Sequence, residues 1–362
     1  MKILLLGEYS NVHNTLAIGL RAMGHQVTVA SNGDFWKNYP RDIDLSRKNT
    51  KIGGILLFLK ICMNLPRWRN YDVVQIIGPM FLELKAERNY LIYKYLRKHN
   101  KKVFIGVNSN DWYVINACCT TMPLRYSDFN NGTQLLDNDY TQKERKEWIG
   151  TIRETMTKHM YLTADGIIPG LYEYWACCKD VYPQKTLYIP YPIIPTPLPV
   201  TSNKIIRIFI GISKGRSKYK GTDIMLRAAQ DIQKKYPDHV ILQIAEGVPF
   251  EKYEKMMNGS DIILDQLYSY TPSMNSLLAM SKGIVVVGGG EPECYDLLNE
   301  KTLRPIINVQ PNYESVYHEL EEIVLHPERI PELKKQSIEF IKKHHDYLKV
   351  ARQYLDFYTQ KG

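Results

Sequence analysis

The chain has 362 residues, enough for two domains of ordinary size, and its 44% hydrophobic content supplies a core that needs no disulfides. The net charge of +9 favours anionic partners: phosphorylated ligands, nucleic acid or an acidic membrane surface. These cations are spread along the chain, and no nucleic-acid module signature occurs, so we expect no nucleic-acid partner.

Six cysteines include two adjacent pairs, Cys118-Cys119 and Cys177-Cys178, and none has zinc-site spacing. We therefore expect reduced thiols, no metal site and a cytoplasmic location. The apolar start, residues 1–7, is too short for a signal peptide. Residues 52–63 come nearest to a membrane span, but Lys60 interrupts them and they fall short of the roughly 18 residues required.

The first half alternates short apolar runs with helical patterns, which predicts a parallel sheet covered on both faces. The expected strands and helices are strand 2–6, helix 14–23, strand 26–30, strand 71–77, helix 84–99, strand 102–107 and strand 164–168.

Five prolines between Ile189 and Val200 predict a stiff, extended connector near the boundary between the two halves. The second half repeats the alternation, with a terminal helical stretch from Ile330 to about Tyr358. The expected elements before that stretch are strands 207–210, 240–245, 261–264 and 283–287 and helices 222–236, 250–257 and 273–281. We predict an α/β protein of two Rossmann-like domains whose ligands bind beyond the carboxyl ends of the strands.

The segment from Gly211 to Gly221 lies between a strand and a helix and holds four cations and three glycines. Glycines let the backbone approach a ligand, amides at a helix start point outward, and Lys and Arg neutralise charge. This segment predicts a phosphate-binding loop.

The loop after the first strand, Gly7–Asn14, lacks the Gly-x-Gly-x-x-Gly fingerprint, which disfavours a Rossmann dehydrogenase. Its polar side chains suit a hydroxyl-rich acceptor. Alternatively, Ser10 or Asn11 caps the helix and His13 is a surface residue.

Several motifs occur together in a recognisable order. They are the Gly24-His-Gln-Val-Thr-Val29 strand entry, Ala164-Asp165, the loop ending in Lys220-Gly221, Ser260-Asp-Ile-Ile-Leu264, Ala279–Val287 and Gly289-Gly-Glu-Pro-Glu293. Together they resemble a GT-B glycosyltransferase of the family-four type (glycosyl transferases group 1) over nearly the full length. The resemblance implies two domains with parallel sheets facing a cleft and a last helix that crosses back to the N-terminal domain. It places the domains at 1–195 for the acceptor, 200–340 for the nucleotide sugar and 341–362 for the terminal helix.

The resemblance also implies a phosphate-binding pair, Lys220 with a second loop cation. That cation is Lys214 or Arg216; we prefer Arg216 because a guanidinium matches two phosphate oxygens at once. Other expected donor-binding residues are Gly211, Val248 near the base, Thr271, Ser273, Met274 and Asn275 at a helix start, and Gly289, Gly290 and Glu291, with Glu293 at the family's Gly-Gly-x-x-Glu position. Pro272 and Ser273 suit a helix start, where amides and the helix dipole favour a diphosphate.

One departure from the family concerns its two glutamates eight positions apart. Tyr270 and Leu278 stand at those positions, so ribose recognition must move elsewhere. Catalysis would consist of nucleoside diphosphate departure, stabilised by Arg216, Lys220 and a helix N-terminus, with retention implied by the resemblance alone. The expected catalytic residues are Arg216, Lys220, His13 and Glu293. No Asp-x-Asp motif follows a strand, and no cofactor beyond a UDP- or GDP-sugar donor is expected.

The acceptor side leaves more alternatives open. His13, Glu8 and Asp111 are base candidates, and Glu8, Ser10, Asn11 and Asp111 are expected acceptor contacts. Residues 52–63, followed by Pro66-Arg-Trp-Arg69, either rest on an anionic membrane at the inner face of the cell membrane, near a lipid-linked acceptor, or pack on the N-terminal sheet. The predicted activity is sugar transfer to a saccharide or lipid-linked acceptor in cell-surface polysaccharide synthesis. The rival hypotheses are an inactive sugar-nucleotide- or polysaccharide-binding protein and a sugar-nucleotide epimerase.

Overall fold

The structure is a computed structural model that describes residues 1–198, 205–213, 215 and 217–360. The chain forms two compact units. Unit 1 contains Met1–Arg125, Phe129–Pro192 and the end of the chain from Tyr347; unit 2 contains Tyr126–Asp128 and Ile193–Asp346. The chain therefore begins and ends in unit 1.

Unit 1 is built on a six-stranded parallel sheet in the order β3-β2-β1-β4-β5-β8. The strands are β1 (Lys2–Leu6), β2 (Gln26–Ser31), β3 (Ile43–Asp44), β4 (Val73–Ile76), β5 (Lys102–Val107) and β8 (Gly166–Pro169), and a small antiparallel pair, β6 (Asn130–Asn131) and β7 (Gln134–Leu135), lies outside this sheet. The central strand β1 is apolar and buried from Ile3 to Leu6 because helices cover both faces of a parallel sheet.

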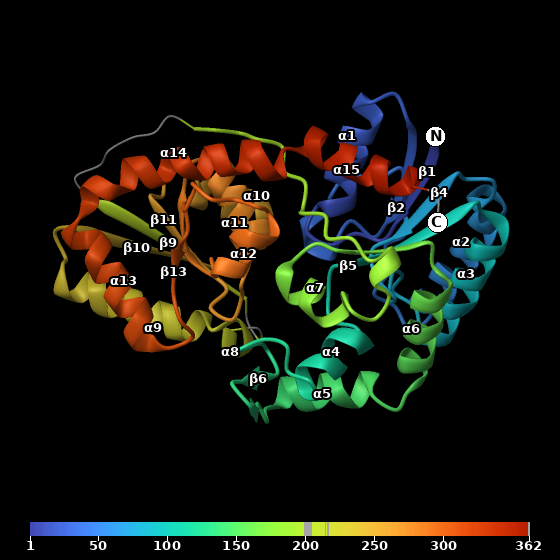
Figure 1. The fold of residues 1–362 in the computed structure, drawn as a ribbon, viewed down its shortest axis with the longest axis horizontal. Coiled ribbons are helices and arrows are strands. Elements are labelled where there is room, and N and C mark those ends of the chain that lie inside the picture. The colour runs from blue at the N-terminus through green and yellow to red at the C-terminus, as the bar shows by residue number, and fades with distance from the viewer. Residues whose placement is uncertain (199–204, 214, 216, 361–362) are drawn as a thin grey trace. The chain divides into compact units, whose positions relative to one another are not determined.

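The helices of unit 1 are α1 (Val12–Ala22), α2 (Gly53–Asn64), α3 (Ala86–His99), α4 (Trp112–Cys119), α5 (Asp139–Trp148), α6 (Ile152–Thr163), α7 (Tyr172–Cys178) and α15 (Tyr347–Thr359), with short turns η1 (Phe35–Lys37), η2 (Leu65–Trp68) and η3 (Pro183–Lys185). The last helix, α15, packs beside α1 (Figure 1) and places Val350, Tyr354 and Tyr358 in the unit 1 core. The two helices approach closely at Gly19, where an added Cβ would lie 2.7 Å from the Tyr347 carbonyl oxygen.

Unit 2 is built on a five-stranded parallel sheet in the order β10-β9-β11-β12-β13. The strands are β9 (Ile206–Ile212), β10 (Val240–Glu246), β11 (Ile262–Asp265), β12 (Val285–Gly288) and β13 (Ile307–Asn308). The helices are α8 (Ser217–Lys220), α9 (Thr222–Lys235), α10 (Phe250–Met257), α11 (Met274–Ser281), α12 (Pro292–Leu297), α13 (Tyr313–Leu325) and α14 (Ile330–Phe340), with the turn η4 (Pro327–Arg329) and a π-helical turn η5 (Ile341–His345). Its core joins Ile208 and Ile210 to Met225 of α9 and Leu320 of α13.

The strand orders locate a topological switch point in each sheet. In unit 1 the order reverses beside β1, between β1 and β4, and in unit 2 beside β9, between β9 and β11. Ligands of open α/β sheets bind at the carboxyl ends of the strands at such points. The loops that follow β1 and β9 contain the two segments that the sequence singled out.

Several local expectations differ from the structure. The strand at 240–246 is an edge strand with half-exposed Ile241 and Ile244 instead of a buried one. The expected terminal helix is two helices, α14 and α15, separated by the π-helical turn. Helices α4 to α6 lie in a stretch, residues 112–163, for which the sequence pattern predicted no element.

Candidate functional site

In unit 2, the segment predicted to bind phosphate, residues 211–221, and the segment that opens α11 meet at the switch point. The Leu267 amide donates to the Lys220 carbonyl at 2.9 Å. Gly221 has a φ of 66° and faces Leu267, whose Cβ would lie 2.5 Å from an added Cβ. Glycine is therefore required for the close approach. Lys220, half-buried, ends the short helix α8 directly before Gly221. The expected loop cations Lys214 and Arg216 lie outside the described residues.

Tyr253 of α10 connects Gly211 with the start of α11. Its hydroxyl donates to Asn275 Oδ1 at 3.0 Å and would lie 2.6 Å from a Cβ added to Gly211. Burial, followed by the nearby Asp265 carboxylate, raises the pKa of this phenol above its ordinary value, so the hydroxyl remains a donor. The structure thus brings together Gly211 and Asn275, two of the expected donor-binding residues, through a tyrosine that the sequence analysis missed.

Asp265 is a second residue that the sequence analysis missed. It ends β11, and its buried carboxylate accepts hydrogen bonds from the Ser273 and Ser276 hydroxyls at 3.2 and 2.7 Å. Ser273 stands at the N-cap of α11 and Met274 is the first helical residue, and both are half-buried. Asp265 thereby fixes the first turn of α11. Its position at the carboxyl end of a strand beside the switch point was the signal that could have identified it.

The three glycines at 288–290 serve close packing within unit 2. An added Cβ at Gly288 would lie 2.2 Å from the Asp265 carbonyl oxygen, and one at Gly289 would lie 1.9 Å from that of Ser269. Gly290 would collide with Ile306 in the same way, and its amide donates to Asn308 Oδ1 at 3.0 Å. An added side chain at any of the three would collide with the chain itself, so packing within unit 2 requires glycine there, and the expected donor contacts of Gly289 and Gly290 stay predictions.

Glu291 is held inside unit 2. Its Oε1 atom accepts hydrogen bonds from the Tyr126 hydroxyl at 2.7 Å, the Gln310 amide at 2.9 Å and the Asn308 amide at 3.1 Å. With three donors on one buried oxygen, Glu291 acts as a structural acceptor at the start of α12. Glu293, in the first turn of the same helix, is half-buried.

The two positions that lack the family glutamates have different environments. Tyr270 is 1% exposed and stacks on Tyr126 with ring centroids 4.7 Å apart, so it is a core aromatic. Leu278 is half-buried on α11. Thr271 is buried, and its carbonyl accepts a hydrogen bond from Ser269. Val248, expected beside the base, is half-buried between β10 and α10.

In unit 1, Glu8 lies in the loop after β1 and caps the start of α1. Its carboxyl oxygens accept the amides of His13 at 3.2 Å and Asn14 at 2.8 Å, so Glu8 supplies the cap that Ser10 or Asn11 was expected to provide. Burial raises the pKa of Glu8 to about 8, although the two amide hydrogen bonds act in the opposite direction. Glu8 is 2% exposed and has little access to an acceptor.

His13 is fully buried, and both ring nitrogens are engaged. Nδ1 lies 2.8 Å from the Gly7 carbonyl oxygen and Nε2 lies 3.1 Å from Nε2 of Gln75. Burial lowers the pKa of His13 to about 4, so the ring is neutral. The buried ring is neither a surface residue nor in a position to take a proton from an acceptor, and the geometry supports a structural role.

Ser10 and Asn11 have left-handed backbone conformations, with φ values of 52° and 73°. Such conformations are uncommon outside glycine and concentrate at functional sites. The Ser10 amide donates to Asp34 Oδ2 at 2.8 Å, and Lys37 Nζ donates to Ser10 Oγ at 3.0 Å and lies 2.6 Å from Asp34. Both residues of the loop are half-buried, which makes them the better placed of the expected acceptor contacts. Asp34 and Lys37 were missed because they follow the neighbouring strand β2.

Asp111 is the N-cap of α4 and is fully buried. Its carboxylate accepts the Val114 amide at 3.1 Å and the Tyr161 hydroxyl. Burial raises the pKa of Asp111 to about 6. These contacts describe a capping residue and do not support its expected role as a base.

A cavity of about 630 Å³ in unit 1 lies between the starts of α2, α3 and α6. Its charged lining comprises four cations and three carboxylates, Arg47, Lys85, Arg88, Arg153, Glu83, Glu87 and Glu147. Arg153 pairs with Glu147 at 2.7 Å. This mixed lining favours neither an anionic nor a cationic ligand.

No cluster of three or more His, Cys, Asp or Glu side chains in the described part of the chain has the geometry to hold a metal ion. Among the described helices, none combines the length and the apolar character required to cross a bilayer.

Comparisons with known proteins place the fold. No family model and no curated protein matches the sequence. Among solved structures, sucrose-phosphate synthase from Thermosynechococcus elongatus is similar with a TM-score of 0.62 at 13% identity, covering 99% of this chain and 98% of that one. Anabaena HepE in complex with UDP and glucose is similar with a TM-score of 0.62 at 10% identity over the whole of both chains.

A third similar structure has another activity in its name. UDP-GlcNAc 2-epimerase from Neisseria meningitidis, bound to UDP-GlcNAc, matches with a TM-score of 0.54 at 11% identity, covering 98% of this chain and 99% of that one. At these identities the similarity concerns the fold. Together with the two parallel sheets, it shows that this chain has the α/β GT-B fold.

Proposed function

We propose that the chain is a glycosyltransferase that moves a sugar from a nucleotide-sugar donor to a saccharide or lipid-linked acceptor. The observation that supports this most is the hydrogen bond between Lys220 and Leu267, because it joins the basic loop to the segment opening α11 at the unit 2 switch point. A lysine and the amides of a helix start are suited to bind a diphosphate. The full-length similarity to structures that contain UDP agrees with this proposal.

The proposed donor site is formed by unit 2. Lys220, with Lys214 or Arg216, would bind the diphosphate, together with the amides of Ser273, Met274 and Asn275. Val248 would lie beside the base, and Glu293 beside the sugar. In the reaction, the bond between the anomeric carbon and the β-phosphate oxygen breaks, and the nucleoside diphosphate departs. The acceptor oxygen bonds to the anomeric carbon, and the proton of the acceptor hydroxyl is released. Cations and amides that stabilise the departing diphosphate lower the barrier without a metal ion.

Further features of the proposal come from the family resemblance alone. They are retention of anomeric configuration and a role in cell-surface polysaccharide synthesis. The proposed cytoplasmic location comes instead from the cysteine pattern. Ser10 and Asn11, with their half-buried side chains at the unit 1 switch point, are the proposed acceptor contacts. A lipid-linked acceptor would bring the protein to a membrane surface.

Replacing Lys220 by alanine tests the donor site. We expect UDP and UDP-sugars to bind roughly 10- to 100-fold more weakly, because a charge-assisted hydrogen bond contributes about 1.5–3 kcal/mol. Isothermal titration measures the affinity, and circular dichroism confirms the fold. The matched control is Lys218→Ala, which removes an exposed cation from the same helix α8. Equal donor affinity in Lys220→Ala and the control would contradict the proposal.

The donor nucleotide can be identified by thermal shift against UDP-, GDP-, ADP- and CDP-sugars. A ligand at a hundredfold excess over its Kd stabilises the folded state by about 2.7 kcal/mol, which raises the Tm measurably. Stabilisation by none of the four would count against a nucleotide-sugar site of any kind.

A sugar-nucleotide epimerase is the second candidate, favoured by the fold similarity to the Neisseria UDP-GlcNAc 2-epimerase. An epimerase converts its donor without an acceptor, whereas a transferase needs one. Product analysis after incubation with the identified donor alone therefore separates the two. Binding without conversion, with or without acceptors, would instead favour the inactive sugar-nucleotide-binding protein suggested by Tyr270 and Leu278.

A further inference from the structure

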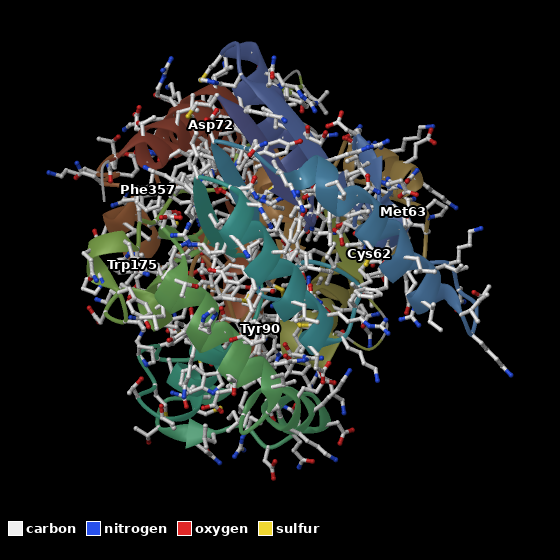
Figure 2. The ribbon with its side chains drawn as sticks, turned by 90° about the vertical axis from the view of Figure 1, so that its right-hand side faces the viewer. Cys62, Met63, Asp72, Tyr90, Trp175 and Phe357 are labelled. Atoms are coloured by element: carbon white, nitrogen blue, oxygen red, sulfur yellow. The ribbon has the colours of Figure 1, made fainter. Side chains whose placement is uncertain are left out.

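Helix α2 has two apolar faces, of which one is exposed among the described residues of unit 1. Leu57 and Ile61 are 3% and 0% exposed and pack inward, as expected for a helix against the sheet. The other face is a stripe of five exposed apolar side chains at helical spacing, namely Ile52, Ile55, Leu56, Leu59 and Met63, with exposed fractions between 42% and 72%. Met63 and Cys62 are labelled on this helix in Figure 2. Packing in unit 1 explains the first face and leaves the second unexplained.

Cations flank this apolar face, and acids are absent from the sequence around it. Between Leu45 and Asn70 the sequence contains six cations and no Asp or Glu, the cations being Arg47, Lys48, Lys51, Lys60, Arg67 and Arg69. Lys48 and Lys51 are exposed before the helix and Arg67 after it. An apolar stripe with cationic ends has the charge that complements an anionic lipid surface.

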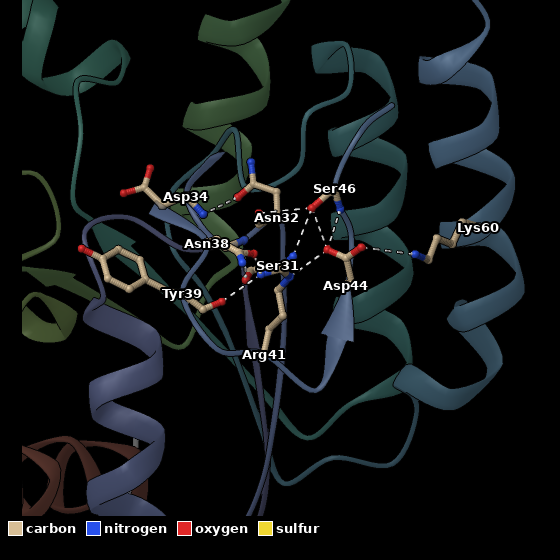
Figure 3. A network of polar contacts seen from close by, with 10 residues as sticks. Ser31, Asn32, Asp34, Asn38, Tyr39, Arg41, Asp44, Ser46 and Lys60 are labelled. Carbon is tan, nitrogen blue, oxygen red and sulfur yellow. Dashed lines mark hydrogen bonds and ion pairs between the residues drawn. The ribbon is translucent and has the colours of Figure 1, made fainter. Parts of the chain in front are cut away.

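The acid nearest to α2 along the chain is Asp44, which is already engaged. Asp44 Oδ1 accepts hydrogen bonds from Arg41 at 2.7 Å and from the Ser46 hydroxyl at 2.6 Å (Figure 3). Lys60 Nζ lies 3.9 Å from the other carboxylate oxygen of Asp44. The network in Figure 3 anchors the segment that leads into α2. Asp44 therefore offsets part of the charge of Arg41 and Lys60, and Glu83, Glu87 and Glu147 line the cavity beside the start of α2. The cations that remain exposed at the flanks of the apolar face are Lys48, Lys51 and Arg67.

Helix α3 lies alongside α2. The Arg88 guanidinium lies 4.6 Å from the centroid of the Phe58 ring, and Tyr95 donates to the Leu65 carbonyl at 3.0 Å. Leu91, 61% exposed, stands between Arg88 and Tyr95 at spacings of three and four residues, so it is on the stripe of α3 that borders α2. Leu91 thus adds one exposed apolar side chain on the neighbouring helix.

We propose that the exposed face of α2, bordered by Leu91, lies on an anionic phospholipid bilayer with its cations against the lipid phosphates. A helix of 12 residues is about 18 Å long, too short to span the hydrocarbon layer, so it lies parallel to the membrane plane. A second copy of the chain is the less suitable occupant. In a symmetric pair of α2 faces, the cationic flanks of both copies would meet and repel each other. Contact of this face with a membrane does not depend on the proposed reaction.

Vesicle co-sedimentation tests the membrane contact. We expect the full chain to sediment with vesicles of equal parts phosphatidylcholine and phosphatidylglycerol, and much less with phosphatidylcholine alone. Leu59→Asp should reduce binding to the anionic vesicles at least tenfold, since it places a carboxylate in the centre of the apolar stripe. The matched control is Leu325→Asp, at a residue of unit 2 that is also 53% exposed, and it should bind as the unchanged protein does.

Charge is tested separately with the double variant Lys51→Gln, Arg67→Gln. It should lose about fivefold in anionic-vesicle affinity for each cation removed, with little change on phosphatidylcholine. Thermal melting and size-exclusion chromatography confirm that each variant folds and show its oligomeric state. The proposal is overturned if the unchanged protein does not bind anionic vesicles, if Leu59→Asp binds as tightly as Leu325→Asp, or if Leu59→Asp instead converts a dimer to a monomer.

Discussion

Glu8 is a carboxyl group enclosed by protein at the end of the first strand, and its titration should be measurable in the stability of the whole chain. The folded-state pKa of about 8 lies above the usual 4.5, so the folded protein binds more protons between these values. The contribution of protonated Glu8 to the free energy of unfolding is therefore fully present below pH 4.5 and is lost as the pH rises through about 8. A shift of this size corresponds to roughly 3–5 kcal/mol.

The variant Glu8→Gln removes this titration. We expect the free energy of unfolding of the unchanged protein to fall between pH 4.5 and about pH 8 relative to that of the variant. Urea denaturation of both proteins across that range measures the difference. Parallel pH profiles would show that Glu8 is ionised throughout.

At the scale of residues, the sequence was a better guide to the positions of important residues than to their roles. It selected Glu8, His13 and Asp111 from the segments that follow strands; Glu8 and Asp111 lie in such loops, whereas His13 lies in the first turn of α1. The structure buries all three, and their hydrogen bonds cap helices or anchor loops. Burial and partner geometry depend on contacts between distant segments, which a local pattern does not contain.

At the scale of elements, close approaches between turns decide where glycine is needed. Gly289 should tolerate no side chain, because the Ser269 carbonyl oxygen would lie 1.9 Å from its Cβ. We expect Gly289→Ala to destabilise unit 2 by about 3 kcal/mol or more through forced displacement of the 265–270 segment. Gly54→Ala is the control, since its Cβ would meet only the Arg47 side chain, at 3.5 Å, inside helix α2. Comparable denaturation midpoints for the two variants would contradict the packing role.

Tyr253 tests the connection between α10 and α11. The variant Tyr253→Phe keeps the ring over Gly211 but loses the hydrogen bond to Asn275. We expect a stability loss of about 1 kcal/mol and weaker donor binding, because the first turn of α11 loses a contact that fixes it. Calorimetry of unfolding and of UDP binding measures both; unchanged UDP affinity would separate Tyr253 from the donor site.

At this scale strand and helix alternation predicted both sheets well, since buried parallel strands are continuous apolar runs. It missed α4 to α6, where aromatic and polar residues are mixed without a clear apolar period, as in the strongly charged helix α5. It did not predict that Gly288 and Gly289 pack against the carbonyl oxygens of Asp265 and Ser269, because a sequence does not show which turns approach each other.

At the scale of the whole molecule, unit 1 is completed only by the last residues of the chain. Helix α15 contributes Val350, Tyr354, Leu355 and Tyr358 to its core, and Lys102 Nζ donates to the Tyr358 and Gln360 carbonyls at 2.9 and 2.7 Å. Each large apolar side chain buried there stabilises unit 1 by about 1.5–3 kcal/mol.

A chain that ends at Asp346 should therefore lose unit 1 selectively. We expect it to bind a hydrophobic dye and to be cleaved by protease within residues 1–192, while residues 205–346 stay resistant. Mass spectrometry of the fragments locates the cleavage. The control is Tyr358→Phe, which keeps the buried ring and should stay resistant throughout; equal resistance in the truncated chain would contradict this dependence.

The hydrogen bonds around His13 all have the same direction. The Tyr358 hydroxyl donates to Gln75 Oε1, Gln75 Nε2 donates to His13 Nε2, and the remaining proton on Nδ1 is donated to the Gly7 carbonyl. A carbonyl can only accept, so the tautomer of the imidazole and the orientation of the amide are determined by the two ends of this relay. His13, the residue that most resembles a proton carrier, is thereby held as a single tautomer. Its nitrogen chemical shifts should stay constant in the folded protein from roughly two pH units above its pKa of about 4.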